Sequence, residues 1–208
     1  MFRYRIAEPG TEDIESWHRL RTSVYLDSGL ITADEVDQSS GLFVDPYDEH
    51  STHVLAANDD GLDIGCIRMV ELGDGRTLPV TDLFGTEPLP HAWESSGNAV
   101  LPEYRRTAVK LGFFRALFAL AEEKSYENMY AIVELPYLDT VRRSLGFPIE
   151  VVSEPQFVFN APNVATLLTR NAVVAAMDAA PAEGSGFAAY LRKPFDWTLK
   201  SADLTPAG

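Results

Sequence analysis

The chain is poor in cysteine, in basic residues and in long apolar stretches. Its 208 residues include one cysteine, Cys66, which excludes an internal disulfide. They include 17 lysines and arginines against 31 aspartates and glutamates, a formal charge of -14, which argues against general attraction to nucleic acid or to an anionic membrane. No run of 18 apolar residues occurs, and the N-terminus lacks the apolar core of a signal peptide. We therefore expect a cytoplasmic protein that neither inserts into a membrane nor binds nucleic acid.

What the chain does have is enough apolar material for a full core. Hydrophobic residues make up 46% of the sequence and aromatic residues 11%, so disorder over most of the length is excluded. The length fits one domain, and we expect residues 1–208 to form a single domain with its oligomeric state open. An Ala, Pro and Gly-rich link at 179–186 and a flexible tail at 200–208 would lie outside the main body.

Hydrophobic periodicity predicts alternating strands and helices. A period of two over Phe2 to Ala7 indicates a strand, and Thr11 is expected to cap a helix that follows. The best hairpin signal joins His53–Ala57 to Leu62–Leu72 through a turn at 58–61. Further strands are expected at 98–101, 129–135, 151–152 and 187–191, and helices at 107–124, 137–145 and 163–179. This alternation predicts an α/β fold with a central sheet.

Two acids three residues apart stand immediately before the hairpin, in Asp45-Pro46-Tyr47-Asp48. The second hairpin strand carries one arginine, Arg68, among apolar neighbours, and a buried guanidinium is costly unless it is paired. Arg21 is a second candidate partner for the acids. This combination predicts a polar site on the sheet, although a structural salt bridge, or simple turn chemistry at the two aspartates, would leave the same pattern.

Two other reactive residue types have ordinary structural interpretations. Cys66 sits in mid-strand with no activating base nearby in the sequence, so we expect a core thiol. His53 opens a strand and suits either a structural or a site role. His50 and His53 with Asp48 lack a third and a fourth ligand at useful spacing, so no metal site is expected.

Together these features resemble a known fold and two families within it. The order of elements, ending in Leu145-Gly146-Phe147, resembles the GCN5-related N-acetyltransferase (GNAT) fold. The order and spacing of the polar residues resemble the acyl-homoserine lactone (autoinducer) synthases and the related long-chain N-acyl amino acid synthases. The residues that carry this second resemblance are Arg21, Tyr25, Asp45, Asp48, His53, Arg68 and the run Trp93-Glu94-Ser95-Ser96. Tyr25 and His53 follow the N-acyl amino acid synthases slightly better.

The resemblance implies the GNAT (acyl-CoA N-acyltransferase) fold, an α/β fold with a central mixed, mostly antiparallel sheet flanked by helices. It also implies an enzyme, an N-acyltransferase. Its co-substrate would be a phosphopantetheine thioester, acyl-CoA or acyl-ACP (acyl carrier protein). The acceptor would be the amine of an amino acid or of a related small molecule.

Site roles follow from the same resemblance. Arg21, Asp45, Asp48 and Arg68 would form an electrostatic network beside the amine, and Glu94 would accept its proton, because an amine attacks a thioester only when neutral. A backbone N–H around Val100 would stabilise the oxyanion. The substrate-binding candidates are Tyr25, His53, Trp93 and Val100, and the phosphate-binding candidates are Arg105, Arg106 and Lys110.

The sequence departs from these families at two places. Gly97 stands where autoinducer synthases have an arginine, and residues 105–110 contain no glycine, although GNAT enzymes hold pyrophosphate with a glycine-rich loop. Backbone N–H groups at a helix start, with the three basic side chains, could still hold a phosphate, and a carrier-protein donor fits the loss better. Two alternatives follow: a non-catalytic GNAT-fold protein that binds acyl thioesters or a partner, and an ordinary acetyl-CoA-dependent acetyltransferase.

Overall fold

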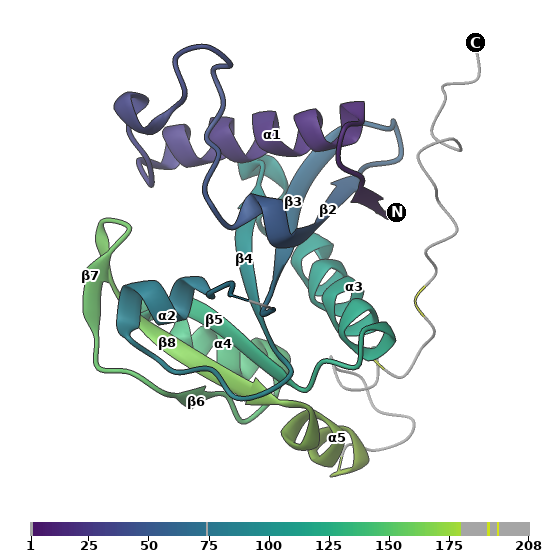
Figure 1. Ribbon diagram of the computed structural model, residues 1–208. Helices are drawn as coiled ribbons and strands as arrows, with labels where there is room; N and C mark the ends of the chain where they lie inside the picture. Colours follow the sequence, from purple (N-terminus) through teal and green to yellow (C-terminus); the bar gives the residue numbers. More distant parts are fainter. Residues whose placement is uncertain (1, 74, 180–190, 192–194, 196–208) are drawn as a thin grey trace. The chain divides into compact units, whose positions relative to one another are not determined.

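The structure, a computed structural model, describes residues 2–73, 75–179, 191 and 195 (Figure 1). They fall into two compact units. Unit 1 takes its residues from Met1–Met69, Ser96–Leu117 and Phe195–Gly208, and unit 2 from Val70–Ser95 and Phe118–Pro194. The expectation of a single domain stays a prediction.

Unit 1 contains the N-terminal strands and the first long helix. Its elements are β1 (Arg3–Ala7), α1 (Glu12–Ser28), η1 (Ala33–Glu35), η2 (Asp48–His50), β2 (Ser51–Ala57), most of β3 (Asp63–Glu71), the second half of β4 (Ala92–Val100), η3 (Pro102–Tyr104) and the first part of α3 (Val109–Glu123). The strand order is β1-β2-β3-β4. β1 runs antiparallel to β2, with Arg3 opposite Ala57 and Ala7 opposite His53. The predicted first strand and hairpin are therefore confirmed.

Helix α1 presents one buried stripe to β1 and β2. Trp17, Arg21 and Val24 recur at helical spacing on that stripe, and Gly29 ends the helix at φ 70, where its N–H bonds to the carbonyls of Leu26 and Tyr25. Thr11 occupies the N-cap position, but its side chain makes no capping bond and donates to the Glu8 carbonyl instead. The predicted cap was therefore wrong in its hydrogen bond.

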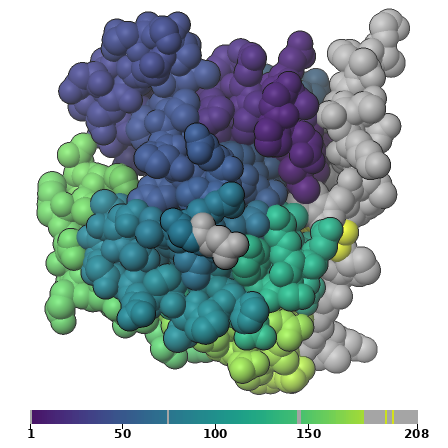
Figure 2. Space-filling view, in the orientation of Figure 1, coloured from purple at the N-terminus to yellow at the C-terminus, as the bar shows by residue number. Residues whose placement is uncertain are grey.

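The segment after α1 returns along the surface of the helix, as Figure 2 shows in dark blue beside the purple N-terminal residues. The N–H of Phe43 donates to the Thr22 hydroxyl at 2.9 Å. This bond places the segment that leads into Asp45 directly against α1.

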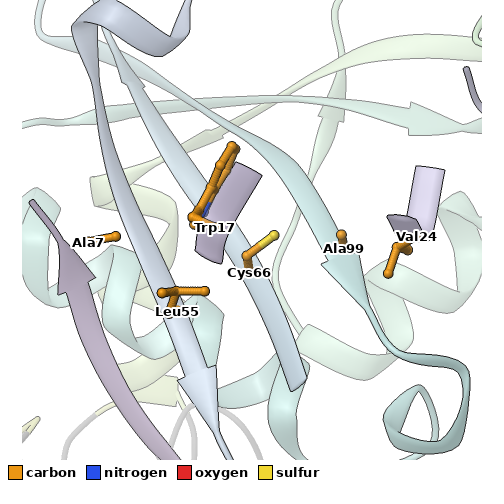
Figure 3. Packing of buried hydrophobic residues seen from close by; sticks show 6 residues of the cluster. All are labelled: Ala7, Trp17, Val24, Leu55, Cys66 and Ala99. Carbon is orange, nitrogen blue, oxygen red and sulfur yellow. The ribbon is translucent and has the colours of Figure 1, made fainter. Parts of the chain in front are cut away.

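The core of unit 1 forms where the four strands meet α1 (Figure 3). Trp17 from α1, Leu55 from β2 and Cys66 from β3 are all fully buried, and Ala99 from β4 packs with them. The indole N–H of Trp17 donates to the Ile67 carbonyl at 3.0 Å, so this large side chain is satisfied as well as buried. The core assignment of Cys66 is confirmed.

Unit 2 is built on an antiparallel strand pair. Its elements are α2 (Pro79–Phe84), β5 (Asn128–Glu134), η4 (Leu135–Tyr137), α4 (Leu138–Leu145), β6 (Glu150–Val151), β7 (Gln156–Val158), β8 (Ala161–Thr169) and α5 (Arg170–Ala179). The strand order is β4-β5-β8-β6, and β7 also pairs with β8. β4 and β5 are parallel over Ala92–Ser95, whereas β5, β6 and β7 each pair antiparallel with β8. The fold class is the expected one: mixed α/β, mostly antiparallel strands, flanking helices.

One element prediction was wrong. The helix expected at 163–179 is a strand, β8, followed by the short helix α5, because the run from Val164 to Leu168 is buried on both faces and pairs with β5. The short helix α2 lies in a stretch for which no element was predicted. Of the strand expected at 187–191, only Leu191 is described. Apart from Ala179, the link expected at 179–186 and the tail expected at 200–208 lie outside the described residues.

Candidate active site

Arg21 is the anchor of a polar cluster inside unit 1. Its side chain is fully buried on α1, with the guanidinium carbon 4.4 Å from the centre of the Trp17 ring and 4.9 Å from that of Phe43. One terminal nitrogen donates to the Phe43 carbonyl at 2.8 Å. Two aromatic faces and a carbonyl therefore hold this cation in one orientation.

Asp45 and Asp48 stabilise their own turn and face Arg21. The N–H of Asp45 donates to Asp48 Oδ2 at 3.0 Å, and the N–H of Tyr47 donates to Asp45 Oδ1 at 3.0 Å. Arg21 binds Asp48 through both terminal nitrogens, at 3.1 and 2.7 Å, and reaches Asp45 at 3.3 Å. The turn hydrogen bonds and the pairing with Arg21 are therefore both made by the same two residues.

Arg68 completes the cluster from β3. It is 3% exposed, and its Nη1 bonds to Asp45 Oδ1 at 2.7 Å and to Asp48 Oδ1. Its Nε donates to the Ser96 hydroxyl on β4 at 2.9 Å. Two carboxylates and two guanidiniums thus form a compact network without excess charge, which is how charges are accommodated away from water. The structure brings the four predicted residues together; their catalytic roles stay predictions.

The network keeps Asp48 ionised. Burial raises the pKa of Asp48, but the hydrogen bond from His53 and the charges of Arg68 and Arg21 outweigh burial and hold that pKa well below its usual value. Burial likewise lowers the pKa of Arg68, and the charges of Asp45 and Asp48 reverse the direction. Asp48 therefore contributes fixed negative charge rather than a proton acceptor.

We expect this depressed pKa to make stability fall in acid. Because the carboxyl binds protons less readily in the folded state, the stabilisation is present above the unfolded pKa of about 4 and is lost as pH falls below it. Chemical denaturation between neutral pH and about pH 3 should show this decline, and the Asp48→Asn variant should show a shallower one. An equal decline in both proteins would contradict the assignment to Asp48.

Of the predicted substrate-binding residues in unit 1, His53 joins the network and Tyr25 does not. His53 Nε2 lies 3.4 Å from Asp48 Oδ1, and the ring is 3% exposed. Tyr25 packs near Phe43, with ring centroids 6.1 Å apart, and burial raises the pKa of its hydroxyl to about 12. It is therefore a neutral phenol beside the network.

Gly97 shows why its position carries no side chain. It lies in β4 at φ 65, and a Cβ there would be 3.1 Å from Arg68 Cγ and 3.1 Å from the Trp17 ring. The left-handed backbone disfavours any side chain, and the space is already filled by two residues of the cluster. The arginine of the autoinducer synthases would therefore require a different local backbone here.

Trp93 and Glu94 lie on the part of β4 that belongs to unit 2. Trp93 is 1% exposed and its ring packs edge-on against Phe118 at 6.4 Å, so its observed contact is core packing. Glu94 is fully buried, and its Oε2 accepts a hydrogen bond from the N–H of Val80 at 2.8 Å. A carboxylate enclosed in this way keeps a defined orientation.

The basic residues gather after the end of β4 in unit 1. Arg105 Nε donates to the Val100 carbonyl at 3.1 Å, so these two predicted residues are in contact. Arg106 and Lys110 are exposed. Desolvation, followed by repulsion from Arg105, lowers the pKa of Lys110. Helix α3 begins at Val109, two residues later than expected, so both arginines precede it.

Sequence reasoning gave no role to two residues of the cluster. Ser96 accepts a hydrogen bond from Arg68, and Phe43 holds Arg21 through its carbonyl and ring. His18, three residues before Arg21 on the same helix, lies near the cluster, but its Nδ1, 4.0 Å from Asp48 Oδ2, makes no hydrogen bond to it.

Residues 2–73, 75–179, 191 and 195 contain no group of three His, Cys, Asp or Glu side chains arranged to hold a metal ion. Among the same residues, no helix has both the length and the apolar character needed to cross a bilayer.

Comparison with known proteins places the chain in a family. Residues 7–174 match the family model described as autoinducer synthase. An acyl-homoserine-lactone synthase of Aeromonas hydrophila is 30% identical over 175 residues, covering 76% of this chain and 80% of the relative, and one of Aeromonas salmonicida is 29% identical over 171 residues with the same coverage. The residues matched by the family model span the whole candidate network.

Solved structures agree on the fold. BjaI, a CoA-dependent acyl-homoserine lactone synthase solved with MTA, has a TM-score of 0.66 at 18% identity, over 92% of this chain and 98% of that one. FeeM, an N-acyl amino acid synthase from uncultured soil microbes, has a TM-score of 0.61 at 17% identity, over 82% and 91%. These structures confirm the GNAT fold, and the family match with the Aeromonas relatives confirms the enzyme interpretation. The chain belongs to the autoinducer synthase family and is an N-acyltransferase, an enzyme that moves an acyl group to an amine.

Proposed function

We propose that this enzyme transfers the acyl group of an acyl-CoA thioester to the amine of S-adenosylmethionine and so makes an acyl-homoserine lactone. The network of Arg21, Asp45, Asp48 and Arg68 carries the proposal, because it lies within the residues matched by the family model and is closed and buried. The Aeromonas relatives, named for this product, and BjaI, solved also with SAM and isopentyl-CoA, support the choice of substrates.

The reaction has two steps. In the acyl transfer, the neutral amine attacks the thioester carbonyl, a C–N bond forms, the C–S bond of the thioester breaks, and the thiolate leaves and takes up a proton. The nitrogen gives up one proton in this step, and we assign its acceptance to Glu94. In the ring closure, the carboxylate of S-adenosylmethionine attacks the carbon of its own methionine chain that is bonded to the sulfonium sulfur, a C–O bond forms, that C–S bond breaks, and methylthioadenosine leaves as a neutral thioether. A backbone N–H at Val100 would stabilise the oxyanion, and the Asp/Arg network would hold the cationic acceptor beside it.

The direct test is a product screen with purified protein. Acyl-CoA thioesters of several lengths, and acyl-ACP of matched length, are each combined with S-adenosylmethionine or with an amino-acid mixture, and products are read by mass spectrometry. We expect an acyl-homoserine lactone, with methylthioadenosine released, from acyl-CoA and S-adenosylmethionine. If product forms from acyl-ACP and not from acyl-CoA, the donor is acyl-ACP and the proposed donor is wrong. Absence of any N-acyl product would overturn the proposal.

A second acceptor, a free amino acid, is favoured by one specific observation. Gly97 replaces the arginine of the autoinducer synthases, and its backbone and surroundings exclude a side chain. An N-acyl amino acid in the screen, with S-adenosylmethionine unused, would favour this acceptor over the first. With either acceptor, the phosphates of the acyl donor would be bound by the same three basic residues, Arg105, Arg106 and Lys110.

Replacing Glu94 by glutamine tests the proton acceptor. The amide keeps the size of the side chain and can still accept from the Val80 N–H, but it cannot take the amine proton. We expect kcat to fall by about 100- to 10,000-fold with little change in thermal stability. The exposed Glu122→Gln change in the same unit serves as the control. Turnover by Glu94→Gln at the level of that control would remove Glu94 from the mechanism.

A further inference from the structure

We infer that His53 is a positioning residue: the hydrogen bond from its Nε2 orients the Asp48 carboxylate and, through it, Arg68. The inference rests on the proposed function for its kinetic consequence. It changes the role of His53: instead of contacting the substrate, His53 holds Asp48, a residue of the network, in position.

The geometry puts His53 on the most heavily shared oxygen of the cluster. Asp48 Oδ1 accepts from Arg21 Nη1 at 3.1 Å and from Arg68 Nη1, and His53 Nε2 approaches the same atom at 3.4 Å. The His53 ring packs against the Trp17 ring in a T-shaped arrangement, with ring centroids 4.4 Å apart. A donor held by packing in this way restrains rotation of the carboxylate that it binds.

The surroundings of the other ring nitrogen, Nδ1, indicate which nitrogen of His53 carries the hydrogen. His53 Nδ1 is buried and has no hydrogen-bond partner among the residues that the structure describes. A hydrogen on Nδ1 would therefore be buried without an acceptor, whereas a hydrogen on Nε2 points at Asp48. The tautomer with hydrogen on Nε2 satisfies the site, so His53 donates and Asp48 accepts.

The effect reaches β4 through Arg68. Asp48 Oδ1 holds Arg68 Nη1, and Arg68 Nε in turn donates to the Ser96 hydroxyl at 2.9 Å. If the carboxylate turns, the guanidinium loses one of its two acidic partners and the aim of its Nε changes. Charge placed to orient a substrate loses its effect when its geometry loosens, even though the chain remains folded.

His18 provides a matched control outside the hydrogen-bonded network. It is also a histidine of unit 1 near Asp48, but its Nδ1 is 4.0 Å from Oδ2, beyond hydrogen-bond distance. Burial, more than any other influence, lowers the pKa of His18, so it approaches the carboxylate as a neutral ring. A hydrogen-bonding role for His53 predicts that only one of these two histidines matters for turnover.

The kinetic test compares His53→Phe, His53→Gln and His18→Leu. We expect His53→Phe, which keeps a ring against Trp17 but loses the donor, to lower kcat about 10- to 100-fold with an unchanged KM for the thioester. We expect His53→Gln, whose amide nitrogen can occupy the place of Nε2, and His18→Leu to stay within about threefold of the parent kcat. Equal losses in His53→Phe and His53→Gln, a loss of the same size in His18→Leu, or a change confined to KM would each overturn the inference.

A second measurement separates failure of this inference from failure of the proposed function. The ¹⁵N and ¹H NMR signals of the His53 ring report the tautomer and the bond to Asp48 without any turnover. We expect the hydrogen on Nε2, and a shift of its resonance in Asp48→Asn. A hydrogen on Nδ1, or a resonance insensitive to Asp48, would overturn the inference even in an active enzyme. The expected signals in an enzyme without N-acyl product would support the contact and refute only the reaction.

Discussion

Replacing Asp48 by asparagine is expected to lower the free energy of unfolding by about 3–5 kcal/mol and to abolish transfer. Asp48 is 9% exposed and binds both guanidiniums of the cluster. Its removal leaves Arg21 fully buried and Arg68 nearly so, with Asp45 as their one remaining acid in the network. Breaking a buried ion pair on one side is costly because the remaining charge stays out of water without compensation. Urea denaturation at neutral pH, followed by circular dichroism, measures the loss.

The control for this experiment is an ion pair on the surface of α1, the helix that carries Arg21. Glu15 and Arg19 are paired at 3.2 Å with side chains 63% and 61% exposed, and Glu15→Gln should change stability by less than about 1 kcal/mol. Similar losses in the two variants would show that Asp48 does not hold a desolvated network.

Replacing Gly97 by alanine is expected to destabilise unit 1 by about 2–4 kcal/mol. Two causes act together there. The backbone lies at φ 65, which an L side chain rarely adopts, and the new methyl would be 3.1 Å from both Arg68 Cγ and the Trp17 ring. Trp17 cannot yield easily, because it is fully buried and its N–H is bonded to the Ile67 carbonyl.

Gly61 isolates the backbone part of that effect. It has φ 80, and an added Cβ would meet nothing within 4 Å, so Gly61→Ala should cost about 1 kcal/mol. The difference between the two alanine variants is then the packing contribution at Gly97. Equal losses at both sites would mean that crowding against Trp17 and Arg68 contributes nothing, and the structural reason given for the missing arginine would fail.

Much of the candidate site could be predicted, because its residues either lie close together in the sequence or would be costly to bury without a partner. The two aspartates stand three residues apart in a turn, and a lone arginine on an apolar strand demands an acid. His53 was open between a structural and a site role, because the sequence does not show that its ring lies 3.4 Å from Asp48 Oδ1. Ser96 appeared only as a member of the family motif, without a role, and the Phe43 carbonyl left no pattern, since a backbone oxygen is not distinguished in sequence.

The fold divides in the same way. The hairpin predicted over His53–Ala57 and Leu62–Leu72 is β2 and β3 in the structure, and there alternation and the turn reinforce each other. Residues 163–169, part of the helix predicted at 163–179, are strand, because a short apolar run is compatible with a buried strand or a buried helix until its partner is known. The partner is β5, paired from Asn128 opposite Thr169 to Glu134 opposite Asn163.

By itself, the sequence determined the acidic charge, the apolar content, the α/β class, the first strand, helix and hairpin, and the turn that sets Asp45 beside Asp48, because each depends on composition or on neighbours a few residues apart. Only the tertiary structure decided which acids Arg68 binds, that His53 approaches Asp48, and that Gly97 lies left-handed against Trp17. These depend on segments 5 to 80 residues apart being packed together. Burial there removes water, so Asp48, His53 and Arg68 acquire one geometry, and the paired Asp48 and Arg68 keep their charges.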